Sequence, residues 1–333
     1  MFRTSRRAFF AIVLLAAGCS SSTSASSSAS PEEPLETASA TPSDDATPTQ
    51  VADRNLRLLA HRGLYHTFDP EGVDDDTCTA ERINPVEHEF IENTIPSMQA
   101  AFDLGAEVVE IDIAPSSDGV LVVFHDWTVD CRTNGTGAVR SLTWDELSQL
   151  DIGYGYTSDG ETFPLRGQEP GLIPRLEEVF DTFPDGQFLI NFKSDDVGEA
   201  ELLHAVVEEA DAAGQVWAVY GGQGAVDAYV SRSGARGFTT TSAITCFTLA
   251  VTSTLETGGE CSDSVVFLPS TSIELLPDGR DQFMQTMADL NNHIVVVDVG
   301  GSGIDTLETF EAIPQDLNAF VWTDRIDLLG PDG

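Results

Sequence analysis

Two histidines stand directly after short apolar runs of the kind that form buried strands. His61 follows the run LLA and precedes Arg62, and His125 follows the run VLVVF and precedes Asp126. Among side chains, histidine titrates closest to neutral pH, so two of them at strand ends suit general acid and general base catalysis. Taken alone, a histidine and an arginine at a strand end also fit a structural pair.

Two carboxylates lie two residues apart in another apolar run, VVEIDI. Because side chains alternate along a strand, Glu110 and Asp112 point to the same face. Two carboxylates this close repel one another unless a cation or a proton lies between them, and oxygen ligands of this type bind hard divalent cations. The pattern therefore favours a metal site, with a strand end that simply reaches solvent as the alternative.

A third run, FLINF, contains Asn191 and is followed by Lys193, and the same alternation places these two side chains on one face. An amide oxygen can bind a metal ion, and an ammonium group can neutralise a phosphoryl oxygen. Lys193 is the only lysine in the sequence. Together with the two histidines, this set suits phosphodiester cleavage, in which a base activates the attacking hydroxyl and an acid protonates the leaving alkoxide.

These residues need strands whose ends meet, and the sequence contains eight β-rich apolar runs. The runs are Leu56 to Ala60, Val108 to Ile113, Phe188 to Phe192, Val216 to Tyr220, Gly237 to Thr241, Val265 to Leu268, Ile294 to Val299 and Ala319 to Trp322. Helical stretches such as Thr94 to Leu104 and Glu199 to Ala213 separate most of them. Strands and helices that alternate over about 250 residues predict an α/β fold, the TIM-type (β/α)8 barrel, with functional groups at the C-terminal ends of the strands.

One interval is too long for a single crossover between two strands. It runs from about residue 114 to 182 and contains a further apolar run, Val120 to Phe124. We expect a small insertion after the second strand of the barrel.

The order of these motifs resembles the glycerophosphodiester phosphodiesterase family. The motifs are HRG at 61–63, ENT at 92–94, E-x-D at 110–112, HD at 125–126, x-x-K ending at 193 and T-D-R at 323–325. The resemblance runs from about Leu56 to Leu329, and the ordered set is far more specific than any single triplet. It implies a TIM-type barrel and a phosphoric diester hydrolase that uses a divalent metal, Mg2+ or Ca2+.

The resemblance also implies roles for individual side chains. His61 and His125 match the catalytic acid and base of the family. Arg62 and Lys193 match contacts to the substrate phosphate. Glu92 matches the glutamate that orients the first histidine and the arginine.

The metal ligands implied by the resemblance include one departure from the family. Glu110 and Asp112 match metal ligands, whereas Asn191 stands where the family usually has glutamate. The site would therefore have one less negative charge, and weaker metal affinity or a preference for Ca2+ would follow.

The N-terminal residues have the features of a signal peptide. Residues 1–19 combine a basic start, an apolar run from Ala8 to Ala17 and a small residue before Cys19. The sequence around Cys19 resembles a bacterial lipobox, which predicts acylation of Cys19 and a membrane anchor; simple cleavage to a secreted protein is the alternative. The motif SRRAF at 5–9 resembles a twin-arginine export signal, although arginine pairs also occur in ordinary secretion signals.

Residues 20–50 are rich in Ser, Thr, Ala and Pro and predict a disordered linker. Residues 51–333 then form the barrel domain. We therefore expect an exported lipoprotein at the cell surface or in the periplasm.

The other four cysteines are an even number in an exported protein and favour two disulfides over a zinc site. Three pairings exist, and a short local loop favours Cys246 with Cys261, which leaves Cys78 with Cys131. A formal net charge of -39 makes nucleic acid an unsuitable partner.

The sequence thus predicts hydrolysis of glycerophosphodiesters to an alcohol and glycerol 3-phosphate. Lysophospholipase D or sphingomyelinase D-like chemistry on the same barrel is the nearest alternative. A catalytically weak lipoprotein that only binds phosphodiesters is a further one, and Asn191 is its sole support.

Overall fold

The computed structural model describes residues 55–73, 77–167, 172–251, 261–276, 279–298 and 301–331. The predicted signal peptide, Cys19 and the linker lie outside these residues, as does Val299 of a predicted strand. In the described part of the chain, no helix is both long enough and apolar enough to cross a bilayer.

Parallel strands form the centre of the fold, and eight of them lie within the described residues. They are β1 (Leu56–His61), β2 (Ala106–Pro115), β4 (Phe188–Phe192), β5 (Val216–Gly221), β6 (Gly237–Phe238), β7 (Val265–Pro269), β8 (His293–Val297) and β9 (Ala319–Thr323). Their order is β6-β5-β4-β2-β1-β9-β8-β7, so the first strand pairs with the last. Between β6 and β7 the barrel is nearly closed: the Ser264 hydroxyl donates to the Gly237 carbonyl at 3.2 Å, and the Phe238 and Phe267 rings lie 5.1 Å apart. The predicted TIM-type barrel is confirmed.

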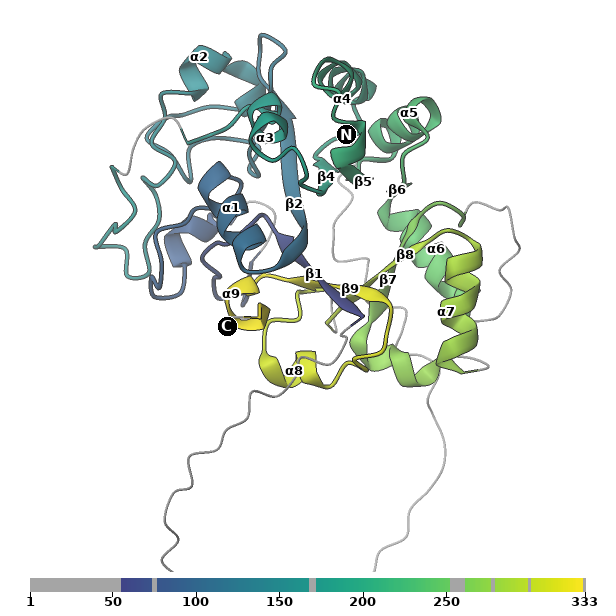
Figure 1. Ribbon diagram of the computed structural model, residues 1–333. Coiled ribbons are helices and arrows are strands. Elements are labelled where there is room, and N and C mark those ends of the chain that lie inside the picture. The colour runs from purple at the N-terminus through teal and green to yellow at the C-terminus, as the bar shows by residue number, and fades with distance from the viewer. Residues whose placement is uncertain are drawn as a thin grey trace, which may run out of the picture. The chain divides into compact units, whose positions relative to one another are not determined.

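Helices lie around the outside of the strands (Figure 1). They are α1 (Ile95–Asp103), α2 (Trp144–Leu147), α3 (Leu176–Thr182), α4 (Val197–Glu209), α5 (Gln223–Ser233), α6 (Thr240–Val251), α7 (Arg280–Asp289), α8 (Leu307–Glu311) and α9 (Ile326–Leu329). Short 3-10 helices are η2 (Thr79–Arg82), η3 (Val139–Ser141), η4 (Ala213–Gln215) and η5 (Ser270–Leu275). Capping fixes where helices begin: the Thr94 hydroxyl accepts from the Ser97 amide at the start of α1.

One predicted strand is wrong in its second half. The strand expected over Gly237 to Thr241 ends at Phe238, and α6 begins at Thr240. The reason is local, because the Thr239 amide donates to the Ser242 hydroxyl at 2.8 Å and the Ser242 amide donates to the Thr239 hydroxyl at 3.2 Å. This reciprocal pair starts a helix, and it outweighs the β propensity of the threonines.

The interval predicted as an insertion has its own small core. Its strand β3 (Leu121–Val123) pairs antiparallel with the end of β2. Apolar side chains such as Val122, Phe124 and Tyr156 form a second buried cluster beside the main core of the barrel. The last helix of the interval, α3, instead buries Phe180 in the main core and so belongs to the barrel wall.

Two disulfides are present, one local, with a sequence separation of 15, and one with a separation of 53. Cys246 of α6 bonds to Cys261 just before β7, and Cys78 just before η2 bonds to Cys131 of the insertion. These are the two predicted pairings. The second ties the loop after β1 to the insertion after β2.

Candidate active site

Polar side chains gather where β1, β2, β4, β5 and β9 end. The parallel ladders pair His61 with Glu110, Asp112 with Asn191, and Asn191 with Tyr220, so these side chains lie at neighbouring levels of the barrel. Strand register therefore brings together residues that are distant in the sequence, such as His61 of β1 and Tyr220 of β5, which are 159 positions apart. This is the end of a (β/α)8 barrel at which enzymes of this fold place their sites.

His61 is held by a carboxylate from the far end of the chain. Its Nδ1 lies 2.6 Å from Asp324 Oδ1, and its Nε2 lies 3.7 Å from Glu110 Oε2. Burial disfavours a charge on Asp324, but His61 outweighs this effect and lowers the pKa of the carboxyl group. The Asp324 amide donates to Asp305 at 2.7 Å, which fixes the backbone that presents the carboxylate.

His125 has the same arrangement with a neighbouring residue. Its Nδ1 lies 2.6 Å from Asp126 Oδ1, which leaves Nε2 as the nitrogen that can exchange a proton with a substrate. Burial, followed by the charge of Arg62, lowers the pKa of His125 to about 4. His125 is therefore neutral at pH 7 and can accept a proton.

Asp112 is surrounded by donors. Its Oδ1 accepts from Asn191 Nδ2 at 2.7 Å and lies 3.3 Å from Lys193 Nζ. Its Oδ2 accepts from Asn93 Nδ2 at 3.0 Å and lies 3.2 Å from Arg62 Nε. Although the group is buried, Lys193 and the other nearby cations lower its pKa well below the usual range.

Glu110 and Asn191 each present an oxygen that accepts no hydrogen bond from the described residues. Glu110 Oε1 accepts from the Tyr220 hydroxyl at 2.6 Å, but Glu110 Oε2 and Asn191 Oδ1 are buried and have no hydrogen-bond partner among the described residues. Burial, followed by the charge of Asp112, raises the pKa of Glu110 to about 7. A hard cation would satisfy two such oxygens, which lie on adjacent strands and accept no hydrogen bond.

The residues therefore fit a divalent cation, with an unusual donor set. In the described ranges, no group of three or more His, Cys, Asp or Glu side chains is arranged to hold a metal ion. The set at this site consists of two carboxylates and one amide, from Glu110, Asp112 and Asn191.

The turn after β1 explains the HRG motif. Arg62 has a φ of 59° and Gly63 a φ of 83°, a left-handed conformation that L-residues rarely adopt. A Cβ atom at Gly63 would lie 2.6 Å from Ser97 Oγ, so only glycine fits there. The strained turn aims the Arg62 guanidinium at Glu92, whose Oε1 lies 3.0 Å from Nη1. Glu92 thus contacts the predicted arginine, whereas the carboxylate bonded to His61 is that of Asp324.

Four further site residues were not predicted. Asn93 holds Asp112, Tyr220 holds Glu110, Asp324 holds His61, and Arg132 holds both Glu92 and Asp126. Asn93 and Asp324 lie inside the ENT and T-D-R triplets, and these motifs were the sequence signal by which the two residues could have been predicted. For Tyr220 and Arg132 the sequence offers no such signal.

The chain is similar to known enzymes of one family over more than half of its length. The model of the glycerophosphoryl diester phosphodiesterase family matches residues 61–245. A glycerophosphodiester phosphodiesterase of Caldanaerobacter subterraneus subsp. tengcongensis is 40% identical over 118 residues, which are 35% of this chain and 44% of that protein. One of Bacillus subtilis is 36% identical over 124 residues, which are 35% of this chain and 41% of that protein. The match thus spans less than half the length of these curated relatives.

Solved structures extend the likeness to most of the fold. A glycerophosphodiester phosphodiesterase from Agrobacterium tumefaciens str. C58 superposes with a TM-score of 0.56 at 21% identity, over 82% of this chain and 96% of that one. A glycerophosphoryl diester phosphodiesterase domain from Mycobacterium tuberculosis gives 0.56 at 18% identity, over 81% and 96%. At these identities the likeness shows the fold alone.

Proposed function

Because this chain belongs to the glycerophosphoryl diester phosphodiesterase family, whose model matches residues 61–245, we propose that it hydrolyses glycerophosphodiesters to an alcohol and glycerol 3-phosphate. The observation that supports this activity best is the pair of histidines at the barrel mouth. Nδ1 of His61 and Nδ1 of His125 each lie 2.6 Å from an aspartate, so the tautomer and the orientation of both rings are fixed.

The two histidines differ in a way that suggests their roles. His125 is neutral at pH 7 because its pKa is about 4, so it accepts a proton from the attacking water as the water oxygen bonds to phosphorus. His61 is flanked by the carboxylates of Asp324 and Glu110 and delivers a proton to the alkoxide as the bond from phosphorus to the alcohol oxygen breaks. The proton lost by the nucleophile and the one gained by the leaving group balance.

The cations of the site suit a phosphodiester. The side chains of Arg62 and Lys193 both lie beside Asp112, one on each of its oxygens. Each is largely buried, so its attraction for a phosphoryl oxygen is screened less than it would be at the surface. The charge that develops on phosphate oxygens during the reaction would be stabilised there.

A divalent cation, Mg2+ or Ca2+, would be held by Glu110, Asp112 and Asn191. When bound, such an ion neutralises charge on phosphoryl oxygens. Asp112 must then exchange some of its present donors for the ion, whereas Glu110 Oε2 and Asn191 Oδ1 need give up no hydrogen bond.

Turnover of glycerophosphocholine by the purified protein tests the proposal. We expect release of glycerol 3-phosphate in the presence of Mg2+ or Ca2+, loss of turnover in His61→Ala and His125→Ala, and normal turnover in His204→Ala, a matched histidine on α4. Equal turnover in all four proteins would refute the assignment of acid and base. Turnover of lysophosphatidylcholine or sphingomyelin but not of glycerophosphocholine would replace it with the lysophospholipase D or sphingomyelinase D-like alternative.

The location of the enzyme is a separate proposal. We propose that Cys19 is acylated and that residues 20–50 tether the barrel domain, residues 51–333, to the outside of a membrane. The two disulfides support export, because such bonds persist in oxidising compartments. Membrane fractionation of cells that express the wild type or Cys19→Ala tests this, and an unchanged distribution would refute the anchor.

A further inference from the structure

Arg132 is the largest fully buried side chain in the described part of the chain, with 2% of its surface exposed. Its Nε donates to Asp126 Oδ2 at 2.8 Å, and its Nη1 lies 3.0 Å from Glu92 Oε2. Nη1 also donates to the Tyr156 hydroxyl at 2.7 Å, and Nη2 donates to Thr79 Oγ1 at 2.9 Å. One guanidinium thus joins two carboxylates and two hydroxyl groups.

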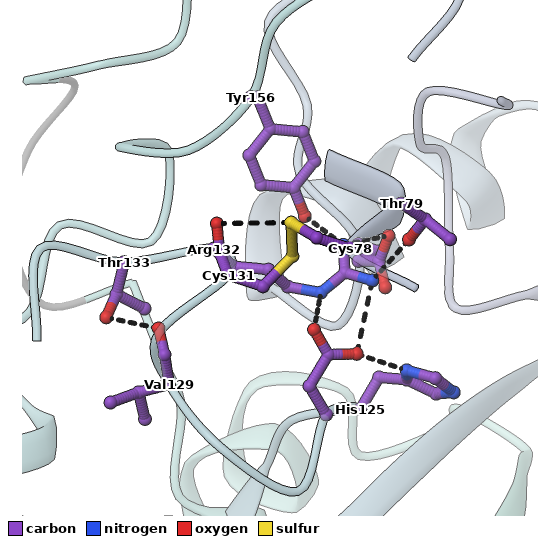
Figure 2. The surroundings of a disulfide bond; sticks show 10 residues. Cys78, Thr79, His125, Val129, Cys131, Arg132, Thr133 and Tyr156 are labelled. Atoms are coloured by element: carbon purple, nitrogen blue, oxygen red, sulfur yellow. Dashed lines mark hydrogen bonds and ion pairs between the residues drawn. A yellow bond between two sulfur atoms is a disulfide. The ribbon is translucent and has the colours of Figure 1, made fainter. Parts of the chain in front are cut away.

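Each of the two carboxylates also contacts a residue that we propose to act in the reaction. Asp126 bonds to Nδ1 of His125 at 2.6 Å, and Glu92 Oε1 lies 3.0 Å from Nη1 of Arg62. The contacts therefore run without a break from His125 through Asp126, Arg132 and Glu92 to Arg62. Figure 2 shows Arg132 beside Tyr156 and Thr79, with His125 nearby.

The Cys78–Cys131 disulfide fixes the backbone on both sides of this guanidinium. Cys131 precedes Arg132, and Cys78 precedes Thr79, which accepts from it. The Gly155 amide donates to the Arg132 carbonyl at 3.2 Å, and a Cβ atom at Gly155 would overlap the Cys131 carbonyl oxygen. The disulfide therefore restrains the backbone next to Arg132, and without it a shift of this backbone would move the guanidinium.

We propose that Arg132, fixed by the Cys78–Cys131 disulfide, is a positioning residue that holds His125 in register with Arg62 through Asp126 and Glu92. Because its side chain is buried, we expect it to act through these residues and not on the substrate itself. The proposal rests on the proposed function for its kinetic consequence, but its structural part concerns the orientation of His125 alone.

The molecule contains a built-in control for this idea. His61 and Asp324 form a second short pair, also 2.6 Å long; the backbone amide of Asp324 donates to Asp305, and in the described part of the chain Arg132 makes no hydrogen bond or ion pair with either residue of this pair. A general loss of folding would disturb both pairs. Loss of Arg132 as a positioning group would disturb only the pair of His125.

Proton NMR of the free protein can distinguish the two pairs. A buried Nδ1–H that donates to a carboxylate gives a signal downfield of the amide region, and His125→Gln assigns the one that belongs to His125. Arg132→Lys keeps the charge but replaces a planar fork of five donors by one ammonium group. We expect this variant to lose or shift the His125 signal and to keep the His61 signal.

Kinetics and the disulfide variants complete the test. We expect Arg132→Lys to lower kcat by ~10- to 100-fold with little change in KM, as for other groups that support a reacting side chain. The double variant Cys78→Ser/Cys131→Ser should shift the same signal and lower kcat, whereas Cys246→Ser/Cys261→Ser, which removes the other disulfide, should do neither. If Arg132→Lys does not fold, the comparison of the two disulfide variants decides.

Retention of the His125 signal and of kcat in Arg132→Lys, or equal effects of the two disulfide variants, would overturn the proposal. Selective loss of the His125 signal supports it even if the wild type fails to hydrolyse glycerophosphocholine. The failure of the proposed function is therefore distinguishable from the failure of this inference.

Discussion

Cation binding should depend on pH through Glu110. This carboxyl group has a pKa of about 7, because burial and the neighbouring Asp112 both disfavour its charged form. Its Oε2 must be free of a proton to bind a cation. Affinity for Mg2+ or Ca2+ is therefore expected to rise as the pH rises through 7 and then to level off.

The expected size follows from the pKa. With a pKa of about 7, Glu110 is about 10% ionised at pH 6 and about 90% ionised at pH 8, so the cation affinity should change about tenfold, or ~1.4 kcal/mol. Binding should release about 0.9 proton at pH 6 and about 0.1 proton at pH 8. Both quantities come from one titrating group.

Isothermal titration calorimetry at pH 6, 7 and 8, in buffers with different ionisation enthalpies, measures affinity and proton release together. The Tyr220 hydroxyl donates to Glu110 and lowers its pKa, so Tyr220→Phe should move the rise in affinity to higher pH. Tyr229→Phe, on α5, is the matched control and should behave like the wild type. Glu110→Gln should bind weakly at every pH.

Two results would refute this reasoning. Equal affinities at pH 6 and pH 8 would show that Glu110 is not a cation ligand or that it does not titrate in this range. Proton release that is the same in the wild type and in Glu110→Gln would assign the proton to another group.

Three further outcomes are expected. Alanine at His61 or His125 should lower kcat by ~10²- to 10⁴-fold, measured at saturating metal, and near-normal turnover in both variants would contradict their roles. Asn191→Glu adds a third carboxylate and should tighten Mg2+ and Ca2+ binding in calorimetry; an unchanged affinity would show that Asn191 is not a ligand. Burial lowers the pKa of His293 to about 4 in the folded protein. Between about pH 6.5 and pH 4 the unfolded chain therefore binds a proton at His293 that the folded protein does not bind, so the free energy of unfolding falls as the pH drops through this range. In urea unfolding, roughly 1 kcal/mol of the stability lost between pH 7 and pH 5 should come from this partly exposed group, so His293→Gln should lose that much less than the wild type; an equal loss in both proteins would show that His293 does not contribute.

The barrel was predictable because parallel strands are buried on both faces. The run FLINF is a strand with all five residues buried, so its sequence is a continuous apolar stretch rather than an alternating one. The strand that begins at Gly237 is short and is followed at once by a capped helix, and there the apolar pattern overestimated its length. Local hydrogen bonds between side chains and backbone, which composition does not reveal, decided that boundary.

The site was predictable where neighbouring site residues belong to the same strand. Glu110 and Asp112 share a face because of alternation, and each lies where that pattern places it. The partners that orient the proposed catalytic groups come from other segments. Arg132 lies in an insertion with no repeating pattern, and its contacts depend on how that segment packs around a disulfide. The side-chain amide of Asn191 donates to Asp112 through Nδ2, while its Oδ1 accepts no hydrogen bond from the described residues. The residue type alone does not determine this orientation.

Because β1 pairs with β9, this part of the barrel can form only after the last strand has been synthesised. Leu56 pairs with Ala319, and His61 meets Asp324 across a sequence separation of 263 residues. On a ribosome, β1 is made early but keeps an unpaired edge until the chain beyond residue 319 emerges. Contacts between residues so distant in sequence form slowly, and until they form the exposed strand edge can pair with other chains and aggregate. The nascent barrel is therefore vulnerable until its final strand is synthesised, and a truncation before Ala319 should remove the carboxylate of Asp324 that holds His61 together with the pairing of β1 with β9.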